Sequence, residues 1–420
     1  MTNTIDSLIG KIPLDSELIE LGECIERIID HRGKTPLKLG SDWKNSGIPA
    51  ISAKNIHGGK LTNINDLRFV DEPTYKKWMG DIDVQYGDCF LVSEGATLGE
   101  YLMWKESYPV VLSQRVFCIR TNPEILDPKY FYAFVQSPGF QNQIEGLSSG
   151  TTVMGLRQTA LLKFLVPIPK IKSQRIIGEF ILNIEDKIDL LHRQNQTLEQ
   201  MAETLFRQWF IEEAKEEWDY VSLANYITIY NGVSYKSTDL NPSKIAMVTL
   251  KSFARNGGFR LDGFKEYTGK YKEQHVVYEG DLVVAHTDIT QDAALIGNPV
   301  LVIGRSEYET LIISMDLVKV ESNYEWLSKV FLYFLMRTRS FKEHCVGYSN
   351  GSTVLHLSKD AVPSYEFLIP PTDQIIEFTS VVNPMIQKIN QNISHIRNLE
   401  QQRDTLLPKL MSGEVRVKLN

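Results

Sequence analysis

The chain has 420 residues, of which 43% are hydrophobic and 23% charged, so two or three domains with buried cores are possible. Its formal net charge of −7 argues mildly against a protein that binds nucleic acid over its whole surface, but it is compatible with local basic loops. No apolar run approaches the roughly eighteen residues of a membrane span, so no membrane association is predicted.

Residues 1–171 predict a mixed α/β lobe. The N-terminal stretch has no basic segment followed by an apolar run, so no signal peptide is predicted. A helix is predicted over Pro128–Gln136. Strands are predicted where β-branched and aromatic residues are bounded by Gly, Pro or Asp, at Cys89–Val92, Val110–Ile119 and Lys163–Ile168.

A long helix is predicted over 172–215, with Ser173 as its N-cap. Its apolar side chains recur at gaps of three and four residues, and only Asn195 interrupts the run. The seam consists of Ile184, Ile188, Leu191, Leu198, Ala202, Leu205 and Trp209. This heptad pattern is typical of a helix that lies along another helix.

A second mixed α/β lobe is predicted over 216–371, and a second long helix with a C-terminal tail over 372–420. The predicted elements of the lobe are strands at Asp281–Ala285, Leu311–Val320 and Tyr365–Ile369 and a helix at Glu325–Arg337. Thr372 or Asp373 is the predicted N-cap of the long helix, and Pro384 is expected to kink or restart it. The second seam consists of Ile389, Ile396, Leu399, Leu406 and Leu410.

The two halves repeat each other. Residues 150–156 match 351–357, and Leu198 matches Leu399, all at an offset of 201. The offset falls to 193 between Gly87 and Gly280 and then returns to 201, so the helices keep their spacing while the lobes differ internally. Ordinary loop drift after duplication and lobes that recognise different targets on a constant frame both account for this difference.

No catalytic residue, metal site or cofactor site is predicted in this chain. The Gly-Lys-Thr run at 33–35 resembles the end of a phosphate-binding loop, but Ile28 stands where that loop needs a glycine. There is no Asn-Pro-Pro-aromatic or Asp-Pro-Pro-aromatic methyltransferase motif, and 213–215 holds only the short part of a nuclease core. The eight histidines show no metal-ligand spacing. Four unpaired cysteines, Cys24, Cys89, Cys118 and Cys345, predict reduced, mostly buried thiols and a cytoplasmic protein.

Polar, glycine-bearing loops in both halves carry the candidate DNA contacts. They are Arg32, Lys34, Lys54, Asn55, His57 and Lys60 in the first half, and Tyr235, Lys236, Lys251, Arg255, Asn256 and Arg260 in the second. Arg, Lys and Asn side chains read guanine and adenine edges, and glycine lets the backbone approach closely. A plain solvated loop is the alternative interpretation of each.

Two hydroxyl-rich loops stand at equivalent places in the halves, each before a short predicted helix. Their candidate residues are Ser149, Gly150, Thr151 and Thr152, and Asn350, Gly351, Ser352 and Thr353. Hydroxyls and free amides at a helix start suit a phosphate oxygen, whereas simple N-capping is the alternative.

Over nearly its whole length the chain resembles the specificity subunit of type I restriction-modification systems. The most specific pieces are the Leu-Phe-Arg-Gln-Trp-Phe run at 205–210 and the run at 406–415 that closes the second helix. The resemblance implies an antiparallel coiled coil, double-stranded DNA as target, and recruitment of two modification (methyltransferase) subunits and, for cleavage, two restriction (motor-nuclease) subunits. S-adenosylmethionine, ATP and Mg would belong to those partners.

The predicted fold class is α/β, with two mixed α/β target-recognition domains joined by two long antiparallel helices in a pseudo-two-fold internal repeat. The predicted function is sequence-specific DNA recognition, in which each lobe reads half of a bipartite target and the helices set the spacer. A stand-alone DNA methyltransferase or nuclease, and a scaffold that does not bind DNA, are the alternatives.

Overall fold

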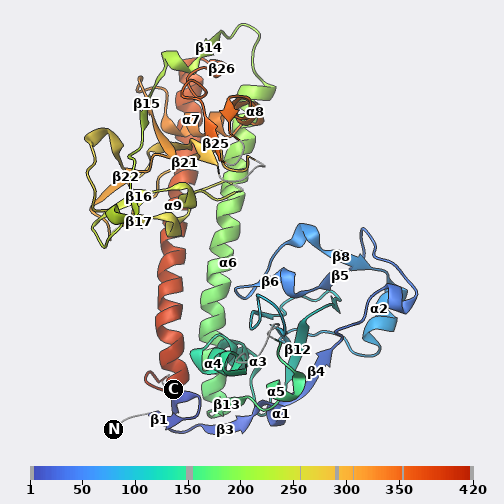
Figure 1. The fold of residues 1–420 in the computed structure, drawn as a ribbon. Helices are drawn as coiled ribbons and strands as arrows, with labels where there is room; N and C mark the ends of the chain where they lie inside the picture. The colour runs from blue at the N-terminus through green and yellow to red at the C-terminus, as the bar shows by residue number, and fades with distance from the viewer. Residues whose placement is uncertain are drawn as a thin grey trace. The chain divides into compact units, whose positions relative to one another are not determined.

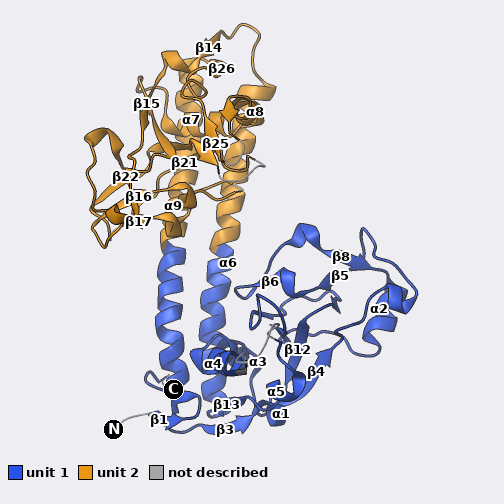
Figure 2. Cartoon of the chain, viewed as in Figure 1, with its two compact units in different colours: residues 1–190, 395–420 blue, residues 191–394 orange. Residues whose placement is uncertain are grey.

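The computed structural model describes residues 4–147, 155–255, 257–288, 293–305, 307–351 and 354–416. The chain forms two compact units (Figure 2): unit 1 comprises 1–190 and 395–420, and unit 2 comprises 191–394. The chain has two long helices, α6 (Ile171–Arg207) and α9 (Thr372–Ser412) (Figure 1). Each contributes one segment to unit 1 and one to unit 2 (Figure 2). Each unit therefore holds one lobe together with parts of both helices.

The lobe of unit 1 contains two main sheets. The first has the order β10-β9-β12-β4 with antiparallel neighbours, and the second has the order β11-β5-β8 with β11 and β5 parallel. Its elements are β1 (Thr4–Ser7), β2 (Gly10–Pro13), β3 (Glu17–Glu20), α1 (Leu21–Cys24), β4 (Ile25–Asp30), β5 (Ile48–Ile51), β6 (Ile56–His57), β7 (Lys60–Leu61), β8 (Arg68–Val70), α2 (Glu72–Met79), β9 (Cys89–Val92), β10 (Tyr101–Met103), β11 (Val111–Leu112), β12 (Val116–Thr121), α3 (Pro128–Val135), α4 (Pro138–Leu147), α5 (Gln158–Leu161) and β13 (Leu165–Ile168).

The lobe of unit 2 repeats this plan. Its first sheet, β15-β23-β19-β21, has the order of β4-β12-β9-β10, and β22 is parallel to β16 as β11 is to β5. Its elements are β14 (Tyr220–Ser222), β15 (Ile227–Asn231), β16 (Ile245–Val248), β17 (Lys265–Glu266), β18 (Val276–Val277), β19 (Leu282–Ala285), β20 (Thr287–Asp288), β21 (Pro299–Leu301), β22 (Thr310–Ile313), β23 (Leu317–Ser322), α7 (Lys329–Met336), α8 (Arg339–Gly347), β24 (Ser349–Asn350), β25 (Leu355–Leu357) and β26 (Glu366–Leu368). The internal repeat predicted from the sequence is therefore present in the fold.

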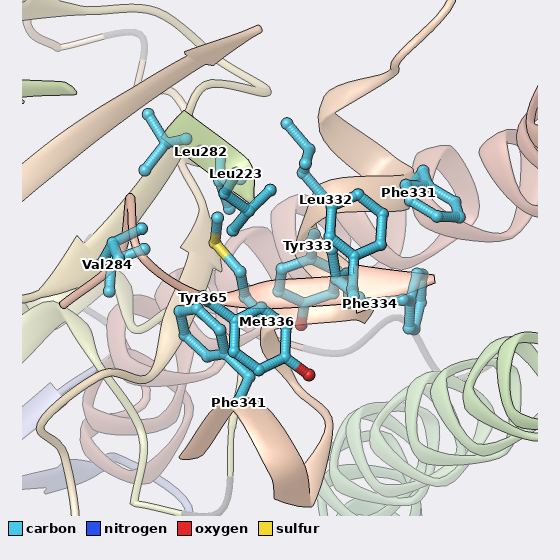
Figure 3. Close-up of a cluster of buried hydrophobic side chains, with 14 of the residues drawn as sticks. Leu223, Leu282, Val284, Phe331, Leu332, Tyr333, Phe334, Met336, Phe341 and Tyr365 are labelled. Carbon is cyan, nitrogen blue, oxygen red and sulfur yellow. The ribbon is translucent and has the colours of Figure 1, made fainter. Parts of the chain in front are cut away.

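The central strands are buried on both faces. Successive side chains of a strand point to opposite sides of the sheet, so each side packs against a different layer. In β9, Cys89 and Leu91 pack with α3 and the long helices, while Phe90 and Val92 pack against the second sheet. In unit 2, Leu282 and Val284 of β19 join the cluster of α7 in the same way (Figure 3). All four cysteines are buried free thiols, as the sequence predicted.

Two predicted strands are each divided in two. Val110–Ile119 becomes β11 and β12, and Leu311–Val320 becomes β22 and β23. At each division the chain leaves one sheet and enters the other. In the first lobe the turn contains Arg115, whose φ of 65° is a left-handed conformation that no strand residue adopts. The prediction of one continuous strand was wrong because a polar turn lies inside each apolar run.

The long helices run antiparallel within each unit. Ile177 near the start of α6 shares a core with Leu410 near the end of α9, and Phe206 near the end of α6 lies 5.5 Å, centre to centre, from the Phe378 ring near the start of α9. Gly178 allows close approach of α3, because a Cβ there would lie 2.4 Å from the backbone nitrogen of Tyr130.

The long helices differ from the expected ones in four places. Helix α9 is continuous through Pro384, so of the two expected effects, a kink or a restart, the restart does not occur. Proline removes one backbone hydrogen bond there, and buried neighbours such as Val382 keep the helix packed. Ser173 lies inside α6 rather than at its N-cap, and α9 already includes Thr372 and Asp373. A π-helical turn, Gln208–Glu212, ends the first helix three residues before its predicted end.

Candidate DNA-recognition surfaces

An open cleft in the first lobe lies beside the turn between β11 and β12. It has a volume of about 390 Å³ and is lined by Thr35, Trp43, Ser52, Ala53, Lys54, Asn55, Asp66, Arg68, Ser113, Gln114 and Arg115. Strand β8 supplies Arg68, the segment after β5 supplies 52–55, and the turn itself supplies 113–115. Residues far apart in the sequence thus meet because β5 pairs with both β11 and β8.

The cleft carries several groups that suit base edges. The Arg68 guanidinium lies 5.3 Å from the centre of the Trp43 ring, a distance at which cation and ring attract each other. Gln114 and Arg115 are exposed, and Arg115 also lies 3.2 Å from a carboxylate oxygen of Glu94. Arginine pairs bidentately with guanine, and glutamine with adenine. The left-handed backbone of Arg115 is a strained conformation of the kind that clusters at functional sites.

Three candidates of the first lobe are engaged within the protein. The Arg32 guanidinium donates to Asp30 at 2.8 and 2.9 Å and lies over the Phe117 ring. The Lys34 ammonium donates to the backbone carbonyl of Trp78, and burial lowers the pKa of Lys34. Both side chains therefore have partners within the first lobe, although Arg32 is also exposed.

The third of these candidates, Asn55, is only 1% exposed, so its side chain does not lie on the surface of the lobe. Its Oδ1 accepts from the Ser52 backbone nitrogen and hydroxyl at 3.2 and 2.7 Å, and its Nδ2 donates to two backbone carbonyls, of Thr62 and Asn63, at 3.4 Å. Such a buried, hydrogen-bonded amide stabilises a turn and cannot reach a base edge in this conformation.

Three further candidates of the first lobe, Lys54, His57 and Lys60, are exposed. Lys54 borders the cleft, and its ammonium lies 3.4 Å from the backbone carbonyl of Asp66. His57 places its Nδ1 2.8 Å from Glu100, and Lys60 lies 2.6 Å from Asp189 of α6.

The candidates of the second lobe fall into two groups. Tyr235 accepts a hydrogen bond from Lys265 at 3.1 Å, and Arg260 is held by Asp262 at 3.0 and 2.5 Å. Arg260 is nevertheless exposed, as are Lys236, Lys251, Arg255, Asn350 and Gly351, of which Gly351 has a φ of 124°. The side chains of Lys236 and Arg255 form no ion pair with any residue that the structure describes.

The remaining candidates lie outside the described residues. They are Ser149, Gly150, Thr151, Thr152, Asn256, Ser352 and Thr353.

The sequence interpretation missed Trp43, Arg68, Gln114 and Arg115 as members of one cleft. One signal was available, because the polar Ser-Gln-Arg run at 113–115 interrupts an apolar stretch. No local pattern marks Trp43 or Arg68, since strand pairing alone brings them to this turn.

The predicted seam faces inward. Of its residues, Ile184, Ile188, Leu191, Ala202, Ile396 and Leu410 are buried, and Leu198, Leu205, Trp209, Ile389, Leu399 and Leu406 are half-buried. Among the described residues, no helix is long and apolar enough to cross a membrane, and no group of His, Cys, Asp or Glu side chains could hold a metal ion.

Comparisons with known proteins agree with this architecture. Residues 13–200 match the family model described as "Type I restriction modification DNA specificity domain". The type I restriction enzyme MjaIX specificity subunit of Methanocaldococcus jannaschii is 24% identical, covering 98% of this chain and 96% of that protein. The EcoKI specificity subunit of Escherichia coli is 23% identical, covering 89% and 83%.

A solved structure shares the fold. The crystal structure of the type I restriction-modification S subunit from M. genitalium superposes with a TM-score of 0.62 at 14% identity, covering 96% of this chain and 97% of that one. The fold is that of a protein with two repeated α/β lobes on a pair of long antiparallel helices. Over most of its length the chain is thus similar to DNA specificity subunits of type I restriction enzymes, and residues 13–200 match the specificity-domain model itself.

Proposed function

We propose that this chain reads a bipartite double-stranded DNA target, with each lobe recognising one half of it. The observation that carries the proposal is the repetition of one sheet plan, with its divided strand, in both lobes. The turn between β11 and β12 and the turn between β22 and β23 therefore hold their side chains at equivalent places in the two lobes. A protein reads a DNA sequence directly through side chains that contact base edges, while its phosphate contacts fix its position on the duplex.

The two turns differ in chemistry. At an offset of 201, Gln114 and Arg115 of the first lobe correspond to Met315 and Asp316 of the second. Met315 is 52% exposed, and Asp316 accepts a hydrogen bond from Thr287 at 3.0 Å. One turn offers donors and the other an apolar group and a carboxylate, which supports different half-sites for the two lobes.

The proposal assigns the chemistry to partner subunits. The helix pair would set the spacer and recruit two modification subunits and, for cleavage, two restriction subunits, in keeping with the family. S-adenosylmethionine, ATP and Mg would be bound by those partners, and this chain would supply no catalytic group. Four buried free thiols support work in the reducing cytoplasm.

Methylome sequencing of cells with and without this chain tests the proposal. One bipartite methylated motif should vanish when the chain is absent, and its two halves should be separated by a fixed gap. If every methylated motif remains when the chain is absent, the proposal of DNA recognition is contradicted.

The alternatives are separated by two measurements on purified protein. Transfer of labelled methyl groups to DNA by the chain alone would indicate a stand-alone methyltransferase, whereas the proposal expects none without modification subunits. Gel shifts with modification subunits should show tighter binding to cognate DNA than to a scrambled sequence. Equal binding to both would favour a scaffold.

A further inference from the structure

A polar layer interrupts the apolar contact between the long helices. Asn392 of α9 is only 2% exposed. Its amide nitrogen donates to Oδ1 of Asn195 at 2.7 Å and to Oε1 of Gln194 at 2.8 Å, both on α6. Asn195 is the residue that breaks the heptad seam in the sequence, so the break has a hydrogen-bonded partner on the other helix.

The internal repeat places different residues at these positions. At the offset of 201, Leu191 of α6 corresponds to Asn392 of α9, and Asn195 of α6 corresponds to Ile396 of α9. Leu191 and Ile396 are 4% and 5% exposed. Each helix therefore carries one asparagine and one aliphatic residue at this pair of positions, but in the opposite order.

This order distinguishes α9 from a second copy of α6. In a self-pair of α6 with the same register, Asn195 would face Leu191 of the other copy. In a self-pair of α9, Asn392 would face Ile396. Either self-pair would place a carboxamide, that of the half-buried Asn195 or of the buried Asn392, against an aliphatic side chain in place of its partner, which is unfavourable. A single buried asparagine sets partner and register in coiled coils by this means.

We propose that the Asn195–Asn392 pair makes each long helix select the other helix of the same chain and reject the equivalent helix of a second copy. The pair would keep two different lobes on one frame, because self-pairing of α6 would bring together two identical first lobes. This inference goes beyond DNA recognition, since no DNA contact enters it.

Single substitutions in the full-length chain place an asparagine opposite an aliphatic residue, as each self-pair would. Asn392→Leu places leucine opposite Asn195, as in a self-pair of α6, and Asn195→Ile places isoleucine opposite Asn392, as in a self-pair of α9. The double variant places two aliphatic residues in the layer. Asn398→Leu, at an exposed position of α9, is the matched control for added apolar surface.

Hydrogen exchange of backbone amides at 188–199 and 388–396 measures the layer directly. Each single variant should exchange faster than the wild type, by up to about tenfold. Asn392→Leu removes the donor to the half-buried Asn195, and Asn195→Ile leaves the buried Asn392 with Gln194 as its remaining acceptor on α6. The double variant should return to the wild-type rate or a slower one, and the control should match the wild type. Wild-type rates in both single variants, or a double variant as fast as the singles, would overturn the proposal.

Partner choice is measured by refolding two differently tagged copies together at high concentration. The double variant, which has lost the polar layer, should form more mixed-tag dimers than either the wild type or the Asn398→Leu control. An equal fraction in all three would overturn the selection role. Because neither measurement involves DNA, failure here is distinguishable from failure of the proposed function.

Discussion

The ammonium of Lys60, at the start of β7, lies 2.6 Å from the carboxylate of Asp189 on α6. Lys105 of the same lobe lies 2.6 Å from Asp186, about one helical turn earlier. Both lysines thus attach the first lobe to one face of α6 within unit 1. Lys60 was a candidate DNA contact, and the structure adds this second role for its charge.

Lys60→Gln should leave both halves of the methylated motif unchanged, because the Lys60 charge is engaged by Asp189. The loss of unfolding free energy should stay below about 1 kcal/mol, as for most exposed ion pairs. Motif sequencing and thermal unfolding measure the two effects. A changed first half-site would show instead that Lys60 reads DNA.

Arg115→Gln should relax recognition at one base pair of the half-site read by the first lobe. The expected loss of discrimination is about 1–3 kcal/mol, the value of a good bidentate contact. Binding of the assembled complex to targets permuted one base pair at a time measures it. Arg339→Gln, whose side chain is 91% exposed in the second lobe, is the control. Unchanged discrimination in Arg115→Gln would remove the cleft from the recognition surface.

A chain truncated after residue 215 should self-pair through α6 and specify a symmetric target. The motivation is that α6 keeps its apolar seam but loses α9. Asn195→Ile in the same truncated chain should tighten the self-pair by about tenfold, because it removes the mismatch with Leu191. Ultracentrifugation at micromolar concentration measures both. A truncated chain that stays monomeric even with Asn195→Ile would count against the repeat as a unit of assembly.

Exchange of residues 20–170 for the first lobe of another family member should change one half of the target and leave the other half unchanged. The reason is that the hydrophobic clusters of the first lobe consist of residues of unit 1, and those of the second lobe consist of residues of unit 2. Motif sequencing reads the result. Changes in both halves would show that the lobes are not independent readers.

Lengthening both helices should lengthen the spacer. Four residues inserted between Leu198 and Glu199 and four between Lys388 and Ile389 leave the Asn195–Asn392 layer intact. Each insertion adds about 6 Å of helix and rotates the downstream part of that helix by about 40°, so the apolar seam stays nearly in register. The half-sites should keep their bases while the gap grows by one or two steps of about 3.4 Å.

A one-residue insertion at the same two sites is the control for the spacer. It rotates the seam by about 100° and should cost assembly rather than alter the gap. If the four-residue variant stays active with its original spacer, the lobes are positioned by the partner subunits.

The sequence by itself determined the features that depend on periodicity and repetition. Gaps of three and four residues predicted the long helices, since one face of a helix must bury its apolar side chains. The constant offset of 201 predicted two related lobes, and Cys89–Val92 was predicted with the boundaries that the structure shows. These features depend on neighbouring residues or on repetition along the chain. They can therefore be recognised in the sequence without knowledge of the tertiary contacts.

Only the tertiary structure decided which distant residues meet. It brings Trp43, Arg68 and Arg115 to one cleft through the pairing of β5 with two other strands, buries Asn55 in a turn, and places Asn392 opposite Asn195. Pairing between strands and helices joins residues that are tens to hundreds of positions apart. A polar residue inside an apolar pattern therefore appears as an interruption in the sequence, and only its partner across the helix pair shows that the interruption is a specific contact.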